Sequence, residues 1–302
     1  MSRSFASKVL LFGEYSVIQN SDALATPYHL FEGKLAFEKQ NKGQRDAELS
    51  ALARYLKKCE EAGDLEFDFD VSSFSFDVGQ GLFFDSTIPQ GYGVGSSGAL
   101  IAAIYDRYGQ NFYEGNQNIS SLKNQFAIME SHFHGSSSGF DPLVSYLNRP
   151  ILKKQVEGLV SVQFKEDPSA KGALFLLNTG RSRKTEPLVN LFLEKCKSEE
   201  YSFLCEQELT PITNNCIDSF LNHDNIALWE HFSLLSRFQF EHFKPMIPKL
   251  YIDLWEQGLE SKEYFLKLCG AGGGGFLMGM TRDFKGLTKD LDSLEIRPIF
   301  KI

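Results

Sequence analysis

Glycines gather in two short segments of this 302-residue chain. Of its 25 glycines, four lie in residues 91–98 and five in residues 270–275. Glycine adopts left-handed backbone at little cost and lets other groups approach the main chain closely. A dense run of glycines therefore needs a tight turn or a nearby ligand as its reason. We expect both segments to be loops against which a second loop or a ligand packs.

The first segment reads Pro89-Gln-Gly-Tyr-Gly-Val-Gly-Ser-Ser-Gly-Ala-Leu100 and lies between a strand-like run and an apolar helix. The free N–H groups and the dipole at the start of that helix favour an anion, and a serine hydroxyl can also ligate Mg²⁺. The alternative is a plain strand-to-helix turn with Ser96 or Ser97 as its N-cap. Four glycines and two serines exceed what a cap needs, so we interpret the segment as a phosphate-binding loop.

Two common nucleotide motifs do not explain this loop. The chain has no Walker sequence, GxxxxGKS or GxxxxGKT. Gly93, Gly95 and Gly98 satisfy the GxGxxG pattern, but no strand ending in an acidic residue follows the helix, as a dinucleotide-binding fold requires. The second segment, Leu268–Phe276, lies between two strand-like runs, so its four consecutive glycines imply close approach to that backbone.

A third cluster, rich in glycine and serine, runs from Glu130 to Asp141. With the hydroxyl of Ser97, these two carboxylates could form a hard-oxygen site for Mg²⁺ and supply a general base. Considered alone, Asp141 is more often a cap or turn residue. His132 and His134 are two residues apart, so a helix would point them in different directions, and we interpret them as structural rather than as metal ligands.

Apolar runs and periodicity predict the secondary structure. Alternating phenylalanines and valines over residues 66–78 predict a hairpin or two paired strands. Residues 185–258 have a helical pattern, with breaks expected at Pro211, Pro245 and Pro248. Further strands are expected at 8–12, 82–88, 173–177, 265–268, 276–280 and 295–300, and further helices at 44–62, 97–108, 120–134 and 283–292.

The order of these elements predicts two α+β lobes, residues 1–168 and 169–302. The first half is rich in strands, the second is rich in helices, and the polar stretch 165–171 separates them. Aromatic side chains of the first lobe could line an adenine pocket, but the alternation favours its core. These side chains are Phe37, Phe67, Phe69, Phe74 and Phe76.

Charge and cysteine content exclude several classes of protein. With 31 Lys+Arg against 39 Asp+Glu, the net charge of −8 argues against nonspecific nucleic-acid binding. A polyanionic ligand would then need local cations or a bound metal. Five widely spaced cysteines without a CxxC pair indicate reduced thiols in a cytoplasmic protein rather than a zinc site or disulfide framework. The apolar runs are too short for a signal peptide or a membrane span.

Together, the three loops resemble the GHMP kinase superfamily, which includes galactokinase, homoserine kinase, mevalonate kinase and phosphomevalonate kinase. The first motif of that superfamily resembles Lys8-Val-Leu-Leu-Phe-Gly-Glu-Tyr-Ser-Val17, its phosphate loop matches Pro89–Ala99, and its third motif matches Leu268–Gly275. Within the superfamily, the chain looks most similar to the mevalonate kinases. Their His-Gly-x-x-Ser-Gly-x-Asp element resembles His134–Asp141, and Asn178-Thr179 resembles the start of their second lobe.

The resemblance implies a two-lobed α+β fold, with a ribosomal-S5-like N-terminal lobe and a ferredoxin-like C-terminal lobe with extra helices. It implies ATP-dependent phosphorylation of an alcohol with Mg²⁺. The expected reaction converts mevalonate to 5-phosphomevalonate, a step of isoprenoid precursor synthesis. Asp141 would be the base, Lys8 would lie beside it, and Ser97 and Glu130 would ligate Mg²⁺. The ATP phosphates would bind at Pro89, Gly91, Gly93, Val94, Gly95, Ser96, Ser97 and Gly98. The substrate would bind at Glu14, Tyr15, His134, Ser138, Gly139, Thr179, Gly272 and Gly273.

The chain departs from the family pattern at three places. Ala6-Ser7 stands where the family has Pro-Gly, Tyr15 replaces a histidine, and Gly98 replaces an alanine. Because Tyr15 lies where the substrate would be recognised, acceptor identity is the part of the function that this departure affects most.

Other functions stay open. A phosphomevalonate or sugar kinase is one, and Arg181, Arg183 and Lys184 are a candidate anion-binding cluster for it, although a solvated turn explains them as well. A catalytically silent, ligand-binding relative is another. The expected partner is a small-molecule alcohol, with no nucleic acid or membrane, and the chain is expected to be a monomer or homodimer.

Overall fold

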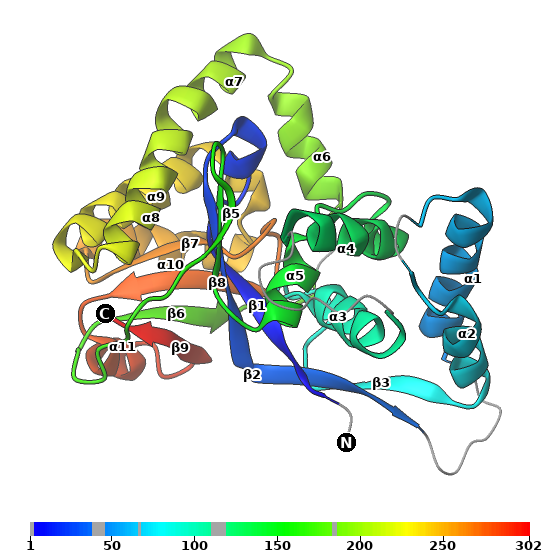
Figure 1. Cartoon of the computed structure of the whole chain (residues 1–302). Coiled ribbons are helices and arrows are strands. Elements are labelled where there is room, and N and C mark those ends of the chain that lie inside the picture. The colour runs from blue at the N-terminus through cyan, green and yellow to red at the C-terminus, as the bar shows by residue number, and fades with distance from the viewer. Residues whose placement is uncertain (1–2, 38–45, 66–67, 110–118, 183–185) are drawn as a thin grey trace. The chain divides into compact units, whose positions relative to one another are not determined.

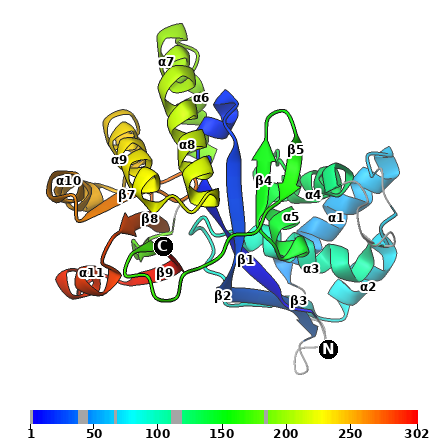
Figure 2. The ribbon, with the colours of Figure 1, turned by 60° about the vertical axis from the view of Figure 1, so that its left-hand side comes forward.

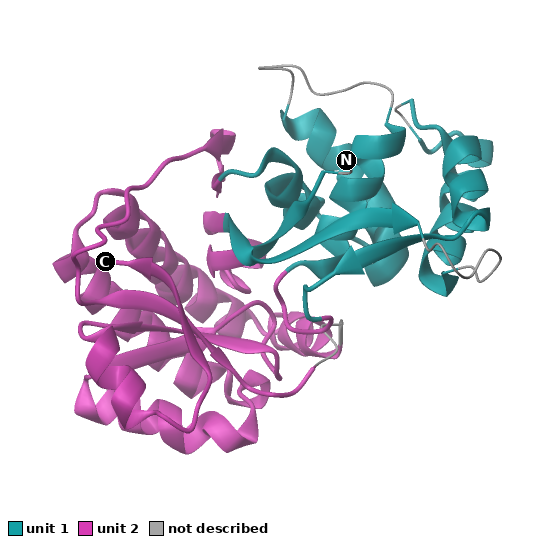
Figure 3. Cartoon of the chain, turned by 90° about the horizontal axis from the view of Figure 1, so that it is seen from below, with its two compact units in different colours: residues 1–8, 26–89, 95–149 teal, residues 9–25, 90–94, 150–302 magenta. Residues whose placement is uncertain are grey.

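The computed structural model describes residues 3–37, 46–65, 68–109, 119–182 and 186–302, which form a mixed α/β structure (Figure 1). Its contacts divide the chain into two units, coloured separately in Figure 3. Unit 1 comprises residues 1–8, 26–89 and 95–149, and unit 2 comprises residues 9–25, 90–94 and 150–302.

Strands β1 (Phe5–Phe12) and β2 (Ala23–Phe37) contribute residues to both units. The predicted boundary between residues 168 and 169 would place residues 9–25 and 90–94 in the first lobe, whereas their contacts group them with unit 2. As a boundary between folding domains, the division at 168/169 stays a prediction.

Unit 1 contains helices and the part of β2 from Thr26 to Phe37. Here β2 pairs antiparallel with β3 (Leu82–Ser86), with Phe37 opposite Leu82. Helices α3 and α5 lie side by side in Figures 1 and 2. Phe74 and Phe126 are fully buried in the core. The helices are α1 (Ala47–Ala62), α2 (Val71–Gly79), α3 (Ser96–Tyr108), α4 (Ile119–His134) and α5 (Phe140–Leu147).

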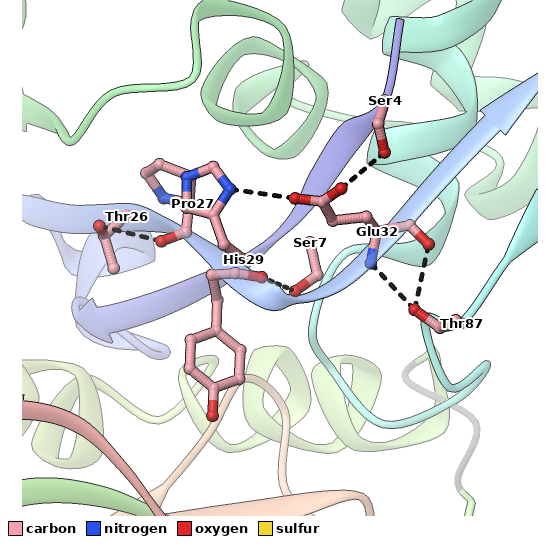
Figure 4. A network of polar contacts seen from close by, with 8 residues as sticks. Ser4, Ser7, Thr26, Pro27, His29, Glu32 and Thr87 are labelled. Atoms are coloured by element: carbon pink, nitrogen blue, oxygen red, sulfur yellow. Dashed lines mark hydrogen bonds and ion pairs between the residues drawn. The ribbon is translucent and has the colours of Figure 1, made fainter. Parts of the chain in front are cut away.

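A polar network ties the strands of unit 1 together around Glu32 (Figure 4). The Glu32 carboxylate accepts a hydrogen bond from Ser4 Oγ at 2.7 Å and lies 3.2 Å from His29 Nδ1. Its backbone N–H donates to Thr87 Oγ1, which in turn donates to the Glu32 carbonyl. The Ser4 hydroxyl, followed by His29, lowers the pKa of Glu32. The network joins the residue before β1, the middle of β2 and the residue after β3.

Unit 2 holds an antiparallel sheet in the order β7-β8-β6-β9. Strands β7 (Tyr264–Leu268) and β8 (Phe276–Thr281) form a hairpin with Leu268 opposite Leu277, so the second glycine tract is the loop of this hairpin. The start of β2 pairs with β4, which pairs with β5, both antiparallel. The remaining strands are β4 (Ile151–Lys154), β5 (Gly158–Ser161), β6 (Ala173–Asn178) and β9 (Ile296–Lys301).

Helices cover both faces of this second sheet (Figure 2). On one face, Trp229 of α9 packs against Phe265 in a tilted arrangement with ring centroids 4.6 Å apart. On the other face, Phe284 of α11 lies 6.1 Å from Phe175. The helices of unit 2 are α6 (Glu186–Lys195), α7 (Glu199–Leu204), α8 (Thr210–Leu221), α9 (Asn225–His242), α10 (Ile252–Ser261) and α11 (Phe284–Asp290).

The strand pair predicted over residues 66–78 is wrong. Residues 71–79 form α2, for which Asp70 is the N-cap and accepts a hydrogen bond from the backbone N–H of Ser73. Val71, Phe74 and Val78 are buried at helical spacing, a period that the alternating pattern also contained. Phe76 is 66% exposed and Phe37 is 42% exposed, so neither is in the predicted aromatic core. Phe67 lies outside the described residues.

The helix break predicted at Pro211 is also wrong. A π-helical segment, Cys205–Leu209, joins α7 directly to α8, and Pro211 lies in the first turn of α8. Proline is tolerated there because the α-helical hydrogen-bond pattern is only beginning. The breaks predicted at Pro245 and Pro248 are confirmed, since α9 ends at His242 and α10 begins at Ile252.

The other predicted strands and helices are confirmed to within a few residues at their ends. In the part of the chain that the structure describes, no helix is long and apolar enough to cross a membrane.

Candidate active site

Strand β1 and helix α5 bring Lys8 and Asp141 together in unit 1. The Lys8 Nζ atom lies 2.9 Å from Asp141 Oδ1. Asp141 is in the first turn of α5, whose N-cap is Gly139 with a left-handed φ of 69°. A side chain at Gly139 would collide with α4, because its Cβ would lie 2.6 Å from the backbone nitrogen of Ala127. Glycine at this position therefore allows α5 to begin close to α4, with Asp141 in its first turn.

The start of α3 packs against this pair. Gly95 is the N-cap of α3 with φ 75°, and a Cβ there would lie 2.8 Å from Lys8 Cγ. A Cβ at Gly98 would lie 2.9 Å from the Asp141 carbonyl carbon. The absence of side chains at both positions lets the predicted phosphate loop approach the ion pair. The departure from alanine at 98 thus has a packing reason in this chain.

A second carboxylate, Glu130 of α4, lies beside the same loop. Ser97 Oγ donates to Glu130 Oε1 at 3.0 Å and also lies 3.2 Å from His134 Nε2. The other carboxylate oxygen, Oε2, accepts from Ser137 Oγ at 2.5 Å. The structure therefore brings together Ser97 and Glu130, the two predicted metal ligands, and places His134 next to them.

The environment of Glu130 raises its pKa to about 7 from an ordinary value of 4.5. Burial is the largest cause, since it disfavours the charged carboxylate, and the negative charge of Asp141 adds to it. Hydrogen bonds from Ser137 and Ser97 and the charge of Lys8 act in the opposite direction. Perturbation by burial and a second carboxylate is typical of functional sites.

The donor set fits a small hard cation. The Ser97 hydroxyl and the Glu130 carboxylate are oxygen ligands of the kind that Mg²⁺ takes, and Mg²⁺ is usually held by one or two carboxylates with waters and substrate phosphates completing its shell. A cation would also offset the cost of ionising buried Glu130. Within the described ranges, no group of three His, Cys, Asp or Glu side chains could hold a metal ion by itself.

Other predicted residues of unit 1 lie in the turn between α4 and α5. Ser138 accepts a hydrogen bond from the backbone N–H of Phe140 at 3.3 Å, which helps to start α5. Ser96 is the first residue of α3 and is partly exposed. Pro89, also partly exposed, precedes the phosphate loop.

In unit 2, the first part of the phosphate loop packs on the second glycine tract. Gly91 and Gly93 have left-handed φ values of 76° and 77°. A Cβ at Gly275 would lie 2.5 Å from the Tyr92 carbonyl oxygen, and the Tyr92 ring packs on Phe276 with centroids 5.4 Å apart. Val94 is buried. The close approach of another loop to the tract, expected from its glycine content, is confirmed within unit 2.

Glu14, predicted to bind substrate, forms a buried ion pair. Lys267 Nζ lies 2.5 Å from Glu14 Oε1, and the two side chains are 0% and 1% exposed. Lys267 also donates to the Leu268 carbonyl, and Gln239 accepts from the Leu268 N–H. This network fixes the start of the glycine tract. The substrate role of Glu14 stays a prediction.

Tyr15 and Thr179 also hold the tract. The Tyr15 hydroxyl donates to the Ala271 carbonyl at 2.6 Å, and its buried ring packs against Phe192 and Phe243. Its φ of 62° is unusual for a residue with a large side chain. Thr179 Oγ1 donates to the Gly275 carbonyl at 2.7 Å. The substrate roles predicted for these residues stay untested.

Gly272 and Gly273 have left-handed φ values of 77° and 79°. The Gly273 N–H donates to the Met246 carbonyl at 2.5 Å, and the space where a Cβ would stand is occupied by Leu188. These glycines are required by the backbone and packing of the tract, and substrate binding there stays a prediction. Two cavities elsewhere, of about 460 and 800 Å³, are lined by Tyr201 and Phe203 of unit 2 and by Glu32 and Lys34 of unit 1, among others, and none of the predicted site residues lines them.

Sequence reasoning missed Ser137, Lys267 and Gln239. Ser137 lies inside the Glu130–Asp141 cluster and Lys267 directly precedes the second glycine segment, so their positions in the sequence could have indicated a role. Their hydrogen-bond partners depend on the fold. Gln239 lies in the last turn of α9 and had no local signal.

The family model for the GHMP kinases N terminal domain matches residues 49–149. This range contains the phosphate loop, Glu130 and Asp141, whose arrangement is described above. Over this range the chain is similar to the GHMP kinase superfamily. No curated protein matches the sequence.

Solved structures of GHMP kinases share the fold over nearly the whole chain. Mevalonate kinase of L. major with R-mevalonate is 16% identical, with a TM-score of 0.64 over 97% of this chain and 91% of that one. Phosphomevalonate kinase of Streptococcus pneumoniae with phosphomevalonate and AMPPNP is 13% identical, with 0.65 over 99% and 100%. Galactokinase of Lactococcus lactis with galactose is 13% identical, with 0.69 over 99% and 93%. At these identities the likeness shows the GHMP kinase fold, and it does not separate the three acceptors.

Proposed function

We propose that this chain is a GHMP kinase that transfers the γ-phosphoryl group of ATP to a hydroxyl of a small alcohol, and that the acceptor is mevalonate. The observation that supports the proposal most is the Lys8–Asp141 ion pair, against which the N-terminus of α3 packs through Gly95 and Gly98. A carboxylate and a cation beside a helix N-terminus are the parts that phosphoryl transfer needs, because it depends on positioning and charge neutralisation.

Asp141 is the proposed general base. The acceptor oxygen forms a bond to the γ-phosphorus, the bond from that phosphorus to the leaving oxygen of ADP breaks, and the hydroxyl proton passes to the Asp141 carboxylate. The Asp141 side chain is 34% exposed, so a substrate can reach it. The Lys8 ammonium orients the carboxylate and adds positive charge where the transferred group is negative.

The first turn of α3 is the proposed phosphate site. The N–H groups at the very start of a helix lack intrahelical acceptors, and the dipole of this 13-residue helix adds positive charge there. Ser97 and Glu130 are proposed to hold Mg²⁺, which when bound neutralises phosphate charge. These local positive charges would neutralise the phosphates even though the net charge of the chain is −8.

The choice of mevalonate rests on sequence. Lys8 and the segment after it, together with the His134–Asp141 element, resemble the mevalonate kinases more than other members of the superfamily. A phosphorylated acceptor would need additional cations. Arg181 is exposed, and Arg183 and Lys184 lie outside the described residues, so no specific observation favours the phosphomevalonate or sugar kinase alternative.

The test is release of ADP by the purified chain with ATP and Mg²⁺, offered mevalonate, phosphomevalonate, galactose or homoserine in turn. We expect the highest kcat/KM with mevalonate. Preference for another acceptor would support the proposed kinase activity and change the proposed substrate. ATP binding without turnover on all four acceptors would instead support the catalytically silent relative.

A further inference from the structure

The hydroxyl of Ser137 contacts both α4 and the N-cap of α5 in the proposed active site of unit 1. It donates to Glu130 Oε2 at 2.5 Å and accepts from the backbone N–H of Gly139 at 3.0 Å. Glu130 lies in the last part of α4, and Gly139 is the N-cap of α5. One side chain thus links the carboxylate on α4 to the start of the helix that carries Asp141.

The two bonds to Glu130 divide its carboxylate oxygens between two serines. Oε2 faces Ser137, whereas Oε1 faces Ser97 of the phosphate loop. The terminal torsion of a glutamate rotates over a broad range when it is unrestrained. A donor on Oε2 therefore fixes the carboxylate plane and keeps Oε1 directed toward the Ser97 hydroxyl.

The position of Ser137 is itself held from α4. Its backbone N–H donates to Ser131 Oγ at 3.1 Å, and Ser131 Oγ donates to the Ala127 carbonyl at 2.7 Å. The turn therefore has a backbone anchor that does not use the Ser137 hydroxyl. The hydroxyl is left for Glu130 and the α5 N-cap, and its single donor hydrogen goes to the carboxylate.

We propose that Ser137 is a positioning residue that holds Glu130 in the orientation needed to bind a divalent cation. The proposal rests on the proposed function only in taking Glu130 and Ser97 as the cation ligands. The family element His-Gly-x-x-Ser-Gly-x-Asp leaves residue 137 unspecified, so the assignment comes from the contacts of this chain. Partners that orient a metal ligand commonly affect metal affinity nearly as much as the ligand does.

The experiment measures Mn²⁺ binding to the full chain, without nucleotide, by the electron paramagnetic resonance signal of free Mn²⁺. The variants are Ser137→Ala, which removes the hydroxyl, and Ser137→Cys, a near-isosteric change to a weaker donor. Ser137→Thr keeps the hydroxyl and is the conservative rescue. Ser136→Ala is the matched control, because Ser136 is an exposed serine next in the same turn. Glu130→Gln is the reference for loss of the ligand itself.

We expect Ser137→Ala to weaken Mn²⁺ binding on the order of tenfold, Ser137→Cys to weaken it by less, and Ser137→Thr to restore it. Ser136→Ala should leave it unchanged. In turnover assays, the half-saturating Mg²⁺ concentration should rise in the same order, by a larger factor than kcat falls. If Ser137→Ala does not fold, Ser137→Cys and Ser137→Thr decide the question.

Wild-type affinity in both Ser137→Ala and Ser137→Cys would overturn the proposal, as would no binding by the wild type or no effect of Glu130→Gln. The two proposals fail separately. A chain that binds Mn²⁺ with the expected order of variants but releases no ADP with any acceptor would support the role of Ser137 and refute the kinase activity. An active kinase whose Mn²⁺ affinity is unchanged by the substitutions at residue 137 would support the kinase activity and refute the role of Ser137.

Discussion

Lys8 and Asp141 form an ion pair in which the cation is buried and the carboxylate is open. The Lys8 side chain is 6% exposed and that of Asp141 is 34% exposed, with 2.9 Å between Nζ and Oδ1. Part of the Asp141 side chain, in the first turn of α5, is therefore accessible to solvent. Two further networks, around Glu130 in unit 1 and around Lys267 in unit 2, hold loops within their own units.

Replacing Lys8 should impair turnover more than nucleotide binding. Lys8→Met keeps the length of the side chain but leaves Asp141 and Glu130 without their nearby cation, so we expect kcat to fall on the order of 100-fold. Lys34→Met, an exposed lysine of the same unit, is the control and should have wild-type kcat. Steady-state kinetics with calorimetric ATP titration checks this, and a kcat within twofold of wild type would remove Lys8 from the mechanism.

Gly98→Ala should lower both activity and stability. Alanine is favoured over glycine inside a helix by about 1 kcal/mol, so helix propensity alone predicts stabilisation. The added Cβ would meet the Asp141 and Pro142 backbone at 2.9 Å, which forces α5 away from α3. We expect a lower urea midpoint and a kcat reduced on the order of tenfold, since small misplacements of a base are costly. An increase in the urea midpoint with full activity would contradict this packing argument.

Stability should depend on the protonation of Glu130. Its pKa is about 7 in the folded chain against an ordinary 4.5, so between these values the folded chain holds the proton more tightly than the unfolded chain. The free energy of unfolding should therefore decrease as pH rises from about 4.5 to about 7, by on the order of 3 kcal/mol.

Glu130→Gln isolates this contribution, because the variant cannot titrate at residue 130. The difference in unfolding free energy between wild type and variant, from urea titrations at several pH values, should shrink or reverse toward neutral pH. Saturating Mg²⁺ favours the ionised carboxylate and should flatten the wild-type dependence. A constant difference from pH 5 to pH 7 would show that burial does not perturb Glu130.

The buried pair of Lys267 and Glu14 should be essential for stability. Lys267→Met leaves the Glu14 charge buried without a partner, which typically costs about 3–5 kcal/mol. The double variant with Glu14→Gln should recover much of that loss. The exposed pair of Lys197 and Glu194 is the control, and Lys197→Ala should change the unfolding free energy by about 1 kcal/mol or less. Urea unfolding measures all three, and equal effects of Lys267→Met and Lys197→Ala would contradict the account of the tract.

Local chemistry allowed many elements to be predicted from the sequence, but β2, β4, β5 and α5 had no predicted counterpart. The strands that flank the glycine tract and helix α3 have apolar patterns that a single segment shows. The failure at residues 66–78 has a specific cause, because Val71, Phe74 and Val78 fit a helical stripe as well as an alternating strand. The capping bond from Ser73 to Asp70 decides for the helix. At Pro211, the preceding π-helical segment could not be foreseen from composition.

For the candidate site, the residues could be predicted from the sequence but their long-range contacts could not. Ser97, Glu130, Lys8 and Asp141 were named from residue chemistry and motif resemblance, and unit 1 brings them together. The contacts of Glu14 and Tyr15 could not be predicted, because Lys267 and Ala271 are more than 250 residues away in sequence. Such long-range partners depend on how β1 and the β7–β8 hairpin come together within unit 2.

The most direct test of the central claim is ADP release by Asp141→Asn with mevalonate, ATP and Mg²⁺, measured beside the wild type. Asparagine keeps the shape of the side chain but cannot accept the hydroxyl proton as a base. The account predicts that wild type forms phosphorylated mevalonate, and that the variant loses at least about 100-fold in kcat while it binds ATP as tightly. Equal kcat for the two proteins would contradict it.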